Sequence, residues 1–369
     1  MICLESIENA KYIETPGGGV KAAVYTASPV FNASLVCGGR EYADSFNDDE
    51  PYDRLTHVFY IEKAPEAGKR LTFCYTLRKK GKNVRRQEIL FTPVYADETA
   101  LLEENDSGTA PERVERETVA DGVEYAHYFC KNKENAPVHV FTLEIDSRKA
   151  GIYTGTPDDG YESVGVRAKV PQMIDAAVKN GVNVVAAVNG DFFDMFGDGH
   201  PGGLCVKNGK IVANADSRRY FIGIEKDGTP VVASLAKEPE LLGKLEHAVS
   251  GLQLIVKDGK VNDWSPLEPF AYVRHPRTAA GVTKDGRIIL LEVDGRIPEY
   301  SNGATLLDLA NMMIKLGADR AVNLDGGGSS VVYIKKGDRF ELQSNPADLI
   351  RPTAKLIRRE YNCLLVVKF

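Results

Sequence analysis

The stretch that most constrains this chain runs from Ala321 to Tyr333 and reads AVNLDGGGSSVVY. Two short apolar runs, which predict strands, are separated by an acid, three glycines and two serines: Asp325, Gly326, Gly327, Gly328, Ser329 and Ser330. Successive glycines permit backbone conformations that other residues avoid, so the chain can turn sharply and expose its N–H groups to a ligand. The sequence therefore predicts two strands joined by an anion-binding turn with a carboxylate at its mouth.

A Walker A phosphate loop and a tight β-hairpin are two other interpretations of this stretch. A Walker A phosphate loop needs Lys and then Ser or Thr after its last glycine, followed by a helix. Here a second strand, Val331 to Ile334, follows the serines, which excludes that motif. A tight β-hairpin needs only one or two glycines and stays open as the alternative.

Length, composition and charge narrow the class of protein. A chain of 369 residues suggests about two domains, and 43% hydrophobic with 27% charged residues is typical of soluble globular proteins. The net charge of −6 comes from interspersed charges, which favours neither a nucleic acid nor a membrane surface as partner. No apolar run approaches the ~20 residues that a membrane span needs. The oligomeric state cannot be predicted from these features.

The N-terminus and the cysteines indicate the compartment. The first residues, MICLESIENAKYIE, lack a basic segment followed by an apolar one, so a cytoplasmic location is expected. If a leader peptide has already been removed, an extracytoplasmic location is expected instead. The six cysteines are far apart and form no CxxC pair, which favours free thiols over disulfides or zinc ligands.

Residues 1–121 predict a β-rich accessory domain with a linker. Alternating apolar and polar residues predict strands at Thr56 to Ala64 and at Arg70 to Ala96, the latter folded as a hairpin around Lys80 to Asn83. The polar, acidic stretch Asp97–Gly122 is interpreted as a linker or surface loop.

Residues 122–369 predict an α+β catalytic domain, a hairpin-rich mixed β-sheet with few helices. Helical periodicity appears at 171–181, which ends at a glycine, and at 305–316, which is followed by Gly317. The second stretch opens with Thr305 and Asp308, a pair that predicts a capping box. Dipeptides that favour hairpin turns recur between short alternating runs: Asn208-Gly209, Asp227-Gly228, Asp258-Gly259 and Asp285-Gly286.

Polar clusters follow four apolar strands of this domain. Besides the stretch around Asp325, they contain Asn189, Gly190 and Asp191; Arg277 and Thr278; and Glu292, Asp294 and Arg296. Glu292 and Asp294 share strand parity, and Arg296 shares it if the strand continues. Singly, Asp294 could belong to an ordinary turn and Arg277 could pair with a structural carboxylate. Together the clusters predict one site if these strand ends meet at one sheet edge.

The residue types in these clusters favour anion recognition beside reactive carboxylates. Arginine matches phosphate oxygens bidentately, and exposed backbone N–H groups add neutral donors. Paired carboxylates are the groups that glycoside hydrolysis uses. The combination predicts a small-molecule or glycan substrate in which a sugar is joined to phosphate.

With these residues identified, the chain from about Gly122 onward resembles the phosphodiester glycosidase family, which includes the mannose 6-phosphate uncovering enzyme. The resemblance rests on AAVNGDFF, GGLCVKNGKIV, RHPRTAAGV, LLEVDGR, the stretch through NLDGGGSS, and REYNCLLVV near the C-terminus, all in the family's order. It implies hydrolysis of a sugar 1-phosphodiester between the anomeric carbon and the phosphate oxygen. N-acetylglucosamine is the family's best-known sugar.

We therefore expect Asp325 or Asp191, with Asp294 as third candidate, to act at the anomeric carbon as nucleophile or as base for water. The expected substrate-binding residues supply cationic, hydroxyl, amide and backbone N–H groups: Asn189, Gly190, Arg277, Thr278, Arg296, Gly326, Gly327, Gly328 and Ser329. No cofactor is required by this chemistry, although the aspartates leave room for a divalent cation. A metal-dependent phosphodiesterase and a non-catalytic binder of phosphorylated glycans stay as alternatives.

Overall fold

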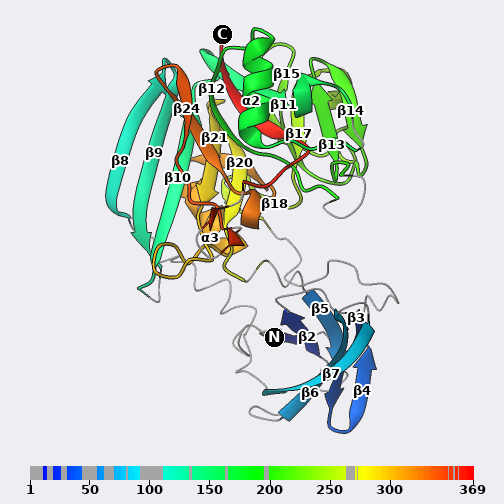
Figure 1. Cartoon of the computed structure of the whole chain (residues 1–369). Coiled ribbons are helices and arrows are strands. Elements are labelled where there is room, and N and C mark those ends of the chain that lie inside the picture. Colours follow the sequence, from blue (N-terminus) through cyan, green and yellow to red (C-terminus); the bar gives the residue numbers. More distant parts are fainter. Residues whose placement is uncertain are drawn as a thin grey trace. The chain divides into compact units, whose positions relative to one another are not determined.

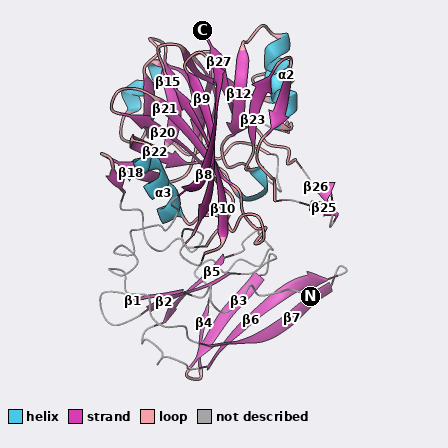
Figure 2. Ribbon diagram, turned by 90° about the vertical axis from the view of Figure 1, so that its left-hand side faces the viewer, coloured by secondary structure: helices cyan, strands magenta, loops and turns pink. Residues whose placement is uncertain are grey.

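The computed structural model describes residues 11–14, 20–25, 31–43, 56–61, 70–79, 82–91, 111–132, 135–162, 165–194, 199–262, 271, 273–347, 349–351, 354–355 and 357–369. The chain divides into two compact units. The first comprises Met1–Asp106 with Ser265–Val273, and the second comprises Ser107–Trp264 with Arg274–Phe369. Strands make up most of the described chain and helices are few (Figure 2).

The first unit contains two small antiparallel sheets. In spatial order the sheets are β1 (Lys11–Glu14), β2 (Val20–Tyr25), β5 (Thr56–Ile61), and β4 (Arg40–Ala43), β3 (Phe31–Cys37), β6 (Arg70–Lys79), β7 (Lys82–Phe91). The pairing of β6 with β7 confirms the predicted hairpin. Phe73 anchors the core of the unit, since its ring contacts those of Phe59 and Tyr75.

An eight-stranded sheet is the largest element of the second unit (Figure 1). Its strands in spatial order are β19 (Lys260–Val261), β18 (Leu254–Lys257), β22 (Ala318–Asn323), β20 (Arg277–Thr283), β21 (Ile288–Val293), β10 (Pro137–Ile145), β9 (Val123–Lys131) and β8 (Pro111–Ala120). The interpretation of residues 111–120 as part of a linker or loop was therefore wrong. Their polar composition reflects the position of β8 as an edge strand whose side chains are largely exposed.

Two five-stranded sheets complete the second unit, together with a small strand pair. The first sheet is β11 (Ala150–Gly155), β27 (Cys363–Lys368), β12 (Val184–Asn189), β23 (Val332–Lys336) and β24 (Arg339–Leu342). The second is β14 (Lys210–Asn214), β13 (Leu204–Lys207), β17 (Leu245–Ser250), β15 (Phe221–Glu225) and β16 (Pro230–Ala233), and the pair is β25 (Leu349–Arg351) with β26 (Ala354–Lys355). Every recorded pairing between described strands is antiparallel, so the expectation of a mixed sheet was wrong.

The four predicted Asx-Gly dipeptides all connect adjacent antiparallel strands. They join β13 to β14, β15 to β16, β18 to β19 and β20 to β21. At Asn208 and Gly209 the φ angles are +47° and +70°. Positive φ at both central residues is the conformation that matches the twist of a two-residue hairpin, which explains the choice of Asn followed by Gly.

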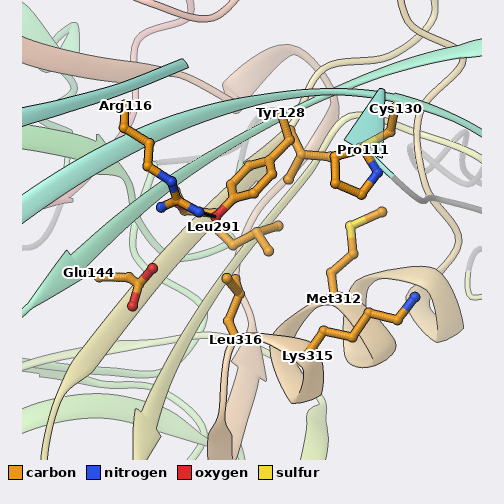
Figure 3. Close-up of a pocket in the computed structure, with 11 residues that line it drawn as sticks. Pro111, Arg116, Tyr128, Cys130, Glu144, Leu291, Met312, Lys315 and Leu316 are labelled. Atoms are coloured by element: carbon orange, nitrogen blue, oxygen red, sulfur yellow. Dashed lines mark hydrogen bonds between the residues drawn. The ribbon is translucent and has the colours of Figure 1, made fainter. Parts of the chain in front are cut away.

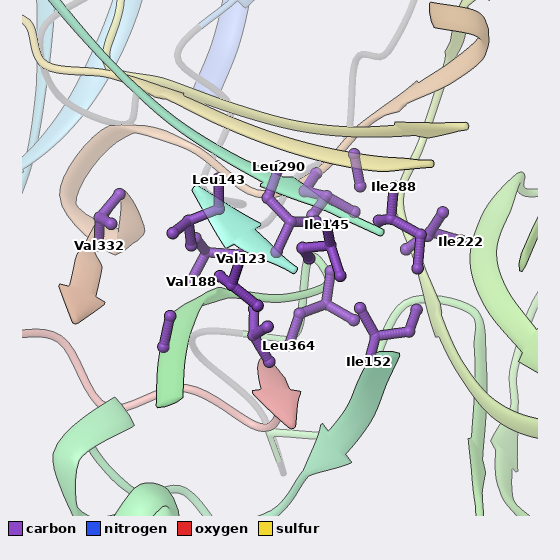
Figure 4. Close-up of a cluster of buried hydrophobic side chains, with 14 of the residues drawn as sticks. Val123, Leu143, Ile145, Ile152, Val188, Ile222, Ile288, Leu290, Val332 and Leu364 are labelled. Carbon is purple, nitrogen blue, oxygen red and sulfur yellow. The ribbon is translucent and has the colours of Figure 1, made fainter. Parts of the chain in front are cut away.

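The core of the second unit lies between the eight-stranded sheet and the sheet that contains β12 (Figure 4). Side chains of Leu143 and Leu290 from the large sheet pack with Val188 and Leu364 from the smaller one. Val184 and Ala187 of β12, with Cys363 and Leu365 of β27, belong to a second cluster with residues of helix α2 (Val170–Lys179). Both faces of this smaller sheet are therefore buried, which explains its nearly continuous apolar strands.

Helix α3 (Leu306–Lys315) packs on the other face of the eight-stranded sheet. A Cβ atom at Gly281 would lie 2.5 Å from Met313 Cε, so the glycine lets the helix approach β20 closely. The predicted capping box is confirmed, because Asp308 N donates to Thr305 Oγ1 and Thr305 N donates to Asp308 Oδ2. Beside the helix this face of the sheet is hollowed into a pocket (Figure 3).

Substitution Thr305→Ala should lower the free energy of unfolding by about 1 kcal/mol, because it removes the side-chain acceptor for Asp308 N. Thr305→Ser keeps the hydroxyl and should stay close to wild type. Urea unfolding followed by circular dichroism measures both variants. Equal stability of the Ala and Ser variants would contradict a capping role.

Candidate active site

The stretch from Ala321 to Tyr333 passes from one sheet to another. It begins in β22 of the eight-stranded sheet and ends in β23 of the five-stranded sheet, with a single 3₁₀ turn at Gly327–Ser329 between them. The hairpin alternative is therefore excluded. Asp325 and the glycines lie where the two sheets of the sandwich are joined.

Asn189, at the end of β12, holds this crossing in place. Its side-chain amide donates to Asp325 O at 2.7 Å, and its Oδ1 accepts from Thr278 Oγ1 at 2.7 Å and from Val331 N at 3.3 Å. Both polar atoms of this fully buried side chain thus bond within the protein. In the structure, Asn189 and Thr278 join strand ends from two sheets. The sequence analysis expected both residues to contact the substrate.

Gly190 is the point where these strand ends come closest. Its carbonyl accepts from Asp325 N at 3.1 Å, and its N–H donates to the Glu360 carboxyl group. A Cβ atom at this position would lie 2.1 Å from Asn362 Oδ1 and 2.8 Å from Asn362 O. Only glycine fits here, so the predicted importance of Gly190 has a steric cause.

Asp325 is a half-buried carboxylate at the crossing. Its Oδ1 accepts from Gly326 N at 2.8 Å and its Oδ2 accepts from Ser329 Oγ at 2.6 Å. Burial raises the pKa of Asp325, while the Ser329 hydrogen bond and the positive charges of Arg358 and Arg296 oppose the rise. A carboxylate that is both activated by desolvation and partly open suits chemistry at this position.

Glu360 is a functional candidate that the sequence analysis missed. Its side chain is 3% exposed, and burial followed by the charge of Asp325 raises its pKa well above 4.5. The residue lies in the REYNC segment of the family resemblance, but it follows no apolar strand and belongs to no cluster of acids. Proximity in the fold, which brings it to Gly190 and Ser329, could not be read from that pattern.

Ser329 links the two carboxyl groups. Its hydroxyl donates to Asp325, accepts from Arg358 Nη1 at 3.2 Å and also contacts the Glu360 carboxyl. A hydroxyl has one proton, so while Ser329 donates to ionised Asp325, Glu360 can bond to it only as a donor. The raised pKa of Glu360 agrees with this protonated form.

Asp191 is the third carboxyl group of the site and is 1% exposed. Its Oδ2 accepts from Gly203 N at 2.9 Å, and Arg219 Nη1 lies 3.5 Å from Oδ1. Burial raises its pKa well above 3.8, the nearby charge of Asp325 raises it further, and Arg219 opposes both effects. The structure thus brings Asp191, Asp325 and the unpredicted Glu360 into one interacting group.

Two arginines, Arg296 and Arg358, bring positive charge close to Asp325. Arg296 follows the end of β21 and has a left-handed conformation with φ of +61°. The strand therefore does not continue to Arg296, so Arg296 does not share strand parity with Glu292 and Asp294. Its Nε lies 3.4 Å from His275 Nδ1, and a Cβ at Gly327 would lie 3.1 Å from both terminal nitrogens. Burial, with Arg277 and Arg296, lowers the pKa of His275 to about 2, which keeps the imidazole neutral.

Two of the groups that were expected to bind phosphate have hydrogen-bond partners within the protein. Arg277 is buried and its Nε donates to Ala304 O at 3.0 Å. Among the glycine-turn N–H groups, that of Gly326 donates to Asp325, that of Gly327 to Pro276 O, and that of Ser329 to Gly326 O. These three donors stabilise the turn itself, and Gly328 is buried within it.

Comparison with known proteins identifies the family of this chain. The family model for phosphodiester glycosidase matches residues 182–366, which is half of the chain and includes Asn189, Asp191, Asp325 and Glu360. The chain belongs to the phosphodiester glycosidase family. It is 30% identical over 190 residues to mouse N-acetylglucosamine-1-phosphodiester alpha-N-acetylglucosaminidase, a match that covers 47% of this chain and 35% of the relative. The chain thus spans about a third of the length of the curated relatives it matches.

Two solved structures share the fold. One is the catalytic domain of the zebrafish N-acetylglucosamine-1-phosphodiester alpha-N-acetylglucosaminidase, auto-inhibited by its pro-peptide, with a TM-score of 0.55 and 21% identity over 70% of this chain and 89% of that one. The other is a hypothetical protein from Synechocystis, with a TM-score of 0.52 and 14% identity over 98% of this chain and 81% of that one. The predominance of strands agrees with this family fold.

Asp294, the third predicted catalytic acid, belongs to a different cluster of the second unit. Its carboxylate accepts from Asn345 N at 2.8 and 2.9 Å and from Tyr300 Oη at 3.0 Å. It also contacts fully buried Glu292, whose carboxyl oxygens have no other hydrogen-bond partner among the described residues. Burial and the charge of Asp294 raise the pKa of Glu292 well above 4.5, so Glu292 is held neutral.

None of the described helices is long and apolar enough to cross a membrane. No set of three or more His, Cys, Asp and Glu side chains in the described ranges is arranged to hold a metal ion. Cys37, Cys74, Cys130, Cys205 and Cys363 are free thiols, and Cys3 lies outside the described residues.

Replacing Glu292 with Gln should stabilise the protein, and the gain should grow with pH. Because the folded-state pKa is raised, the unfolded chain releases the Glu292 proton first, and wild-type stability falls as pH rises from about 4.3 toward the folded pKa. Glutamine cannot ionise, so the difference should grow by up to about 1.4 kcal/mol per pH unit in that window. Urea unfolding at pH 5 and pH 7 measures it, and a constant difference would contradict a buried neutral Glu292.

Proposed function

We propose that this chain is a hydrolase that cleaves a sugar 1-phosphodiester between the anomeric carbon and the phosphate oxygen, releasing free sugar and a phosphomonoester. The observation that carries the proposal is the juxtaposition of Asp325 and Glu360 with Arg296 and Arg358. Family membership supports the reaction class, and the names of the relatives suggest an N-acetylglucosamine 1-phosphodiester as the first substrate to test.

The arginines would hold the phosphate. A phosphomonoester leaving group is a weak base, so its departure depends on stabilising the developing negative charge more than on protonation. Arg296 and Arg358 both act electrostatically on Asp325, so a phosphate that they hold would lie beside this carboxylate. Buried Arg277 would add its positive charge to that of Arg296 and Arg358. We propose that these groups suffice without a cofactor.

Asp325 would act at the anomeric carbon, as nucleophile or as base for water. It is the most accessible of the three coupled carboxyl groups, and Gly326 N and Ser329 Oγ fix its orientation. Asp191 is almost completely enclosed and would tune the charge of the site. Glu360, kept protonated, would hold the Ser329 hydroxyl in the orientation that donates to Asp325.

The substrate assay uses a GlcNAc-1-phosphodiester incubated with and without chelator. Release of free sugar that survives chelation is the expected result. Release of sugar 1-phosphate, or activity that is lost in chelator, would instead favour a metal-dependent phosphodiesterase. Tight binding without turnover would indicate the non-catalytic glycan binder.

Substitution Asp325→Asn should reduce kcat/KM for this substrate by about 10²- to 10⁴-fold, because the amide can act neither as base nor as nucleophile. The matched control is Asp121→Asn, at an exposed carboxylate paired with Lys149, which should leave turnover unchanged. Thermal melting of both variants checks that each is folded. Wild-type kcat/KM in a folded Asp325→Asn variant would overturn the assignment.

The pH profile of kcat/KM should be bell-shaped. Asp325 must be ionised and its pKa is raised, so activity should fall on the acid side at a pH above 3.8. Glu360 must stay protonated and its pKa is raised well above 4.5, so activity should fall again on the alkaline side. In Glu360→Gln, which keeps a donor that cannot titrate, the alkaline limb should disappear while the acid limb stays. An unchanged alkaline limb would assign it to another group, such as Asp191.

A further inference from the structure

Arg219 is a partly exposed arginine that reaches the candidate active site from the connection between β14 and β15. Its Nη1 atom lies 3.5 Å from Oδ1 of Asp191, and its side chain is 23% exposed, whereas the Asp191 side chain is closed to solvent. The sequence analysis did not identify Arg219, and the phosphate-binding role proposed for Arg296 and Arg358 does not involve it. The site therefore contains a further cation that the proposed mechanism does not use.

Two consecutive glycines lie under the Arg219 side chain. A Cβ atom at Gly202 would lie 2.1 Å from Nη1 and 2.5 Å from Cζ of Arg219. A Cβ atom at Gly203 would lie 3.1 Å from Cδ of Arg219 and 2.4 Å from Ser250 Oγ. Neither glycine has a positive φ angle, so turn geometry does not explain their choice. Glycine at position 202 is therefore explained by the guanidinium that lies across it.

The turn that carries Arg219 is anchored to the neighbouring structure. The amide of Arg219 donates to Asp216 O at 3.2 Å. The hydroxyl of buried Ser234, at the end of β16, is shared between the carbonyl oxygens of Ser217 and Arg218, each at 3.2 Å. These bonds fix the direction from which the guanidinium approaches the carboxyl group.

The hydrogen bonds of Asp191 indicate that its carboxyl group is ionised. Its recorded partners in the part of the chain that the structure describes are all donors: the N–H groups of Gly203 and Phe192, and the guanidinium of Arg219. A protonated carboxyl group would need an acceptor, and a buried carboxylate needs a compensating positive charge. Burial raises the pKa of Asp191 and Arg219 lowers it, so loss of the arginine should favour the neutral form.

We propose that Arg219 is a positioning residue for Asp191: the guanidinium that lies across Gly202 holds Asp191 as a fixed carboxylate beside Asp325. This role rests on the proposed glycosidase activity and extends it. The transition state of glycoside hydrolysis resembles an oxocarbenium ion, so positive charge develops at the anomeric carbon. Asp191 is closed and does not touch the substrate, but its charge interacts with Asp325 and stabilises that positive charge electrostatically.

A double-mutant cycle between Arg219→Met and Asp191→Asn tests the proposal, with the GlcNAc-1-phosphodiester as substrate. Arg219→Met keeps an apolar stem and removes the charge, so kcat should fall by about 10-fold while KM stays within about 2-fold of wild type. In the Asp191→Asn background the same substitution should change kcat by less than about 2-fold, because the carboxylate that Arg219 holds is absent. An equal loss of kcat in both backgrounds, or a loss confined to KM, would overturn the proposal.

Gly202→Ala is a second test, which leaves the arginine in the sequence. The added Cβ atom would displace the guanidinium, so kcat should fall as it does in Arg219→Met. The matched control is Gly243→Ala, where a Cβ atom meets nothing within 4 Å, and its kcat should equal that of wild type. Arg148→Met, at an exposed arginine paired with Asp146, controls for the loss of a surface charge. Wild-type kcat in Gly202→Ala would contradict the placement of the guanidinium.

Unfolding by urea distinguishes failure of this inference from failure of the proposed function, because it needs no turnover. At pH 7, Arg219→Met should lower the urea midpoint of the wild-type protein but not that of Asp191→Asn, since the ion pair exists only when both partners are present. An equal lowering in both backgrounds would overturn the ion pair whatever the activity. Absence of turnover by the wild type, with the coupling in urea intact, would instead overturn the proposed function and the catalytic part of this role.

Discussion

The site depends on one buried amide. Asn189 joins β12 to Thr278 of the eight-stranded sheet and to the backbone on both sides of the glycine turn. Each of its hydrogen bonds lies in the protein interior, where leaving a polar group unpaired costs more than in water. These bonds fix the position of Asp325, and the absence of a side chain at Gly190 lets the Asn362 segment close against the same point.

Burial then determines the charge state of the acids that are brought together. Asp191, Asp325 and Glu360 interact electrostatically, and each is desolvated, so the three cannot all ionise at low cost. The ordering of the proposed roles follows from accessibility and hydrogen bonding. Asp325 is the most open and accepts two hydrogen bonds as an anion, whereas Glu360 meets a hydroxyl whose proton is already donated.

Much of the architecture could be predicted from local patterns. The Asx-Gly turns and the capping box at Thr305 act over a few residues, so their signals survive in the sequence. Predictions that depend on tertiary contacts were less accurate. Polar strand β8 resembled a linker because an edge strand buries little, and Glu360 gave no signal because its partners lie far away in the chain. Asp294 resembled Asp325 in sequence, and only the fold assigns it to Tyr300 and Asn345.

The bond that is broken tests the central claim most directly. Hydrolysis of a GlcNAc-1-phosphodiester in ¹⁸O-labelled water, with both products examined by mass spectrometry, shows which atom the water attacks. Attack at the anomeric carbon beside Asp325 predicts that the label enters the free sugar and that the phosphomonoester stays unlabelled. Label in the phosphomonoester would mean cleavage at phosphorus and would contradict a glycosidase mechanism.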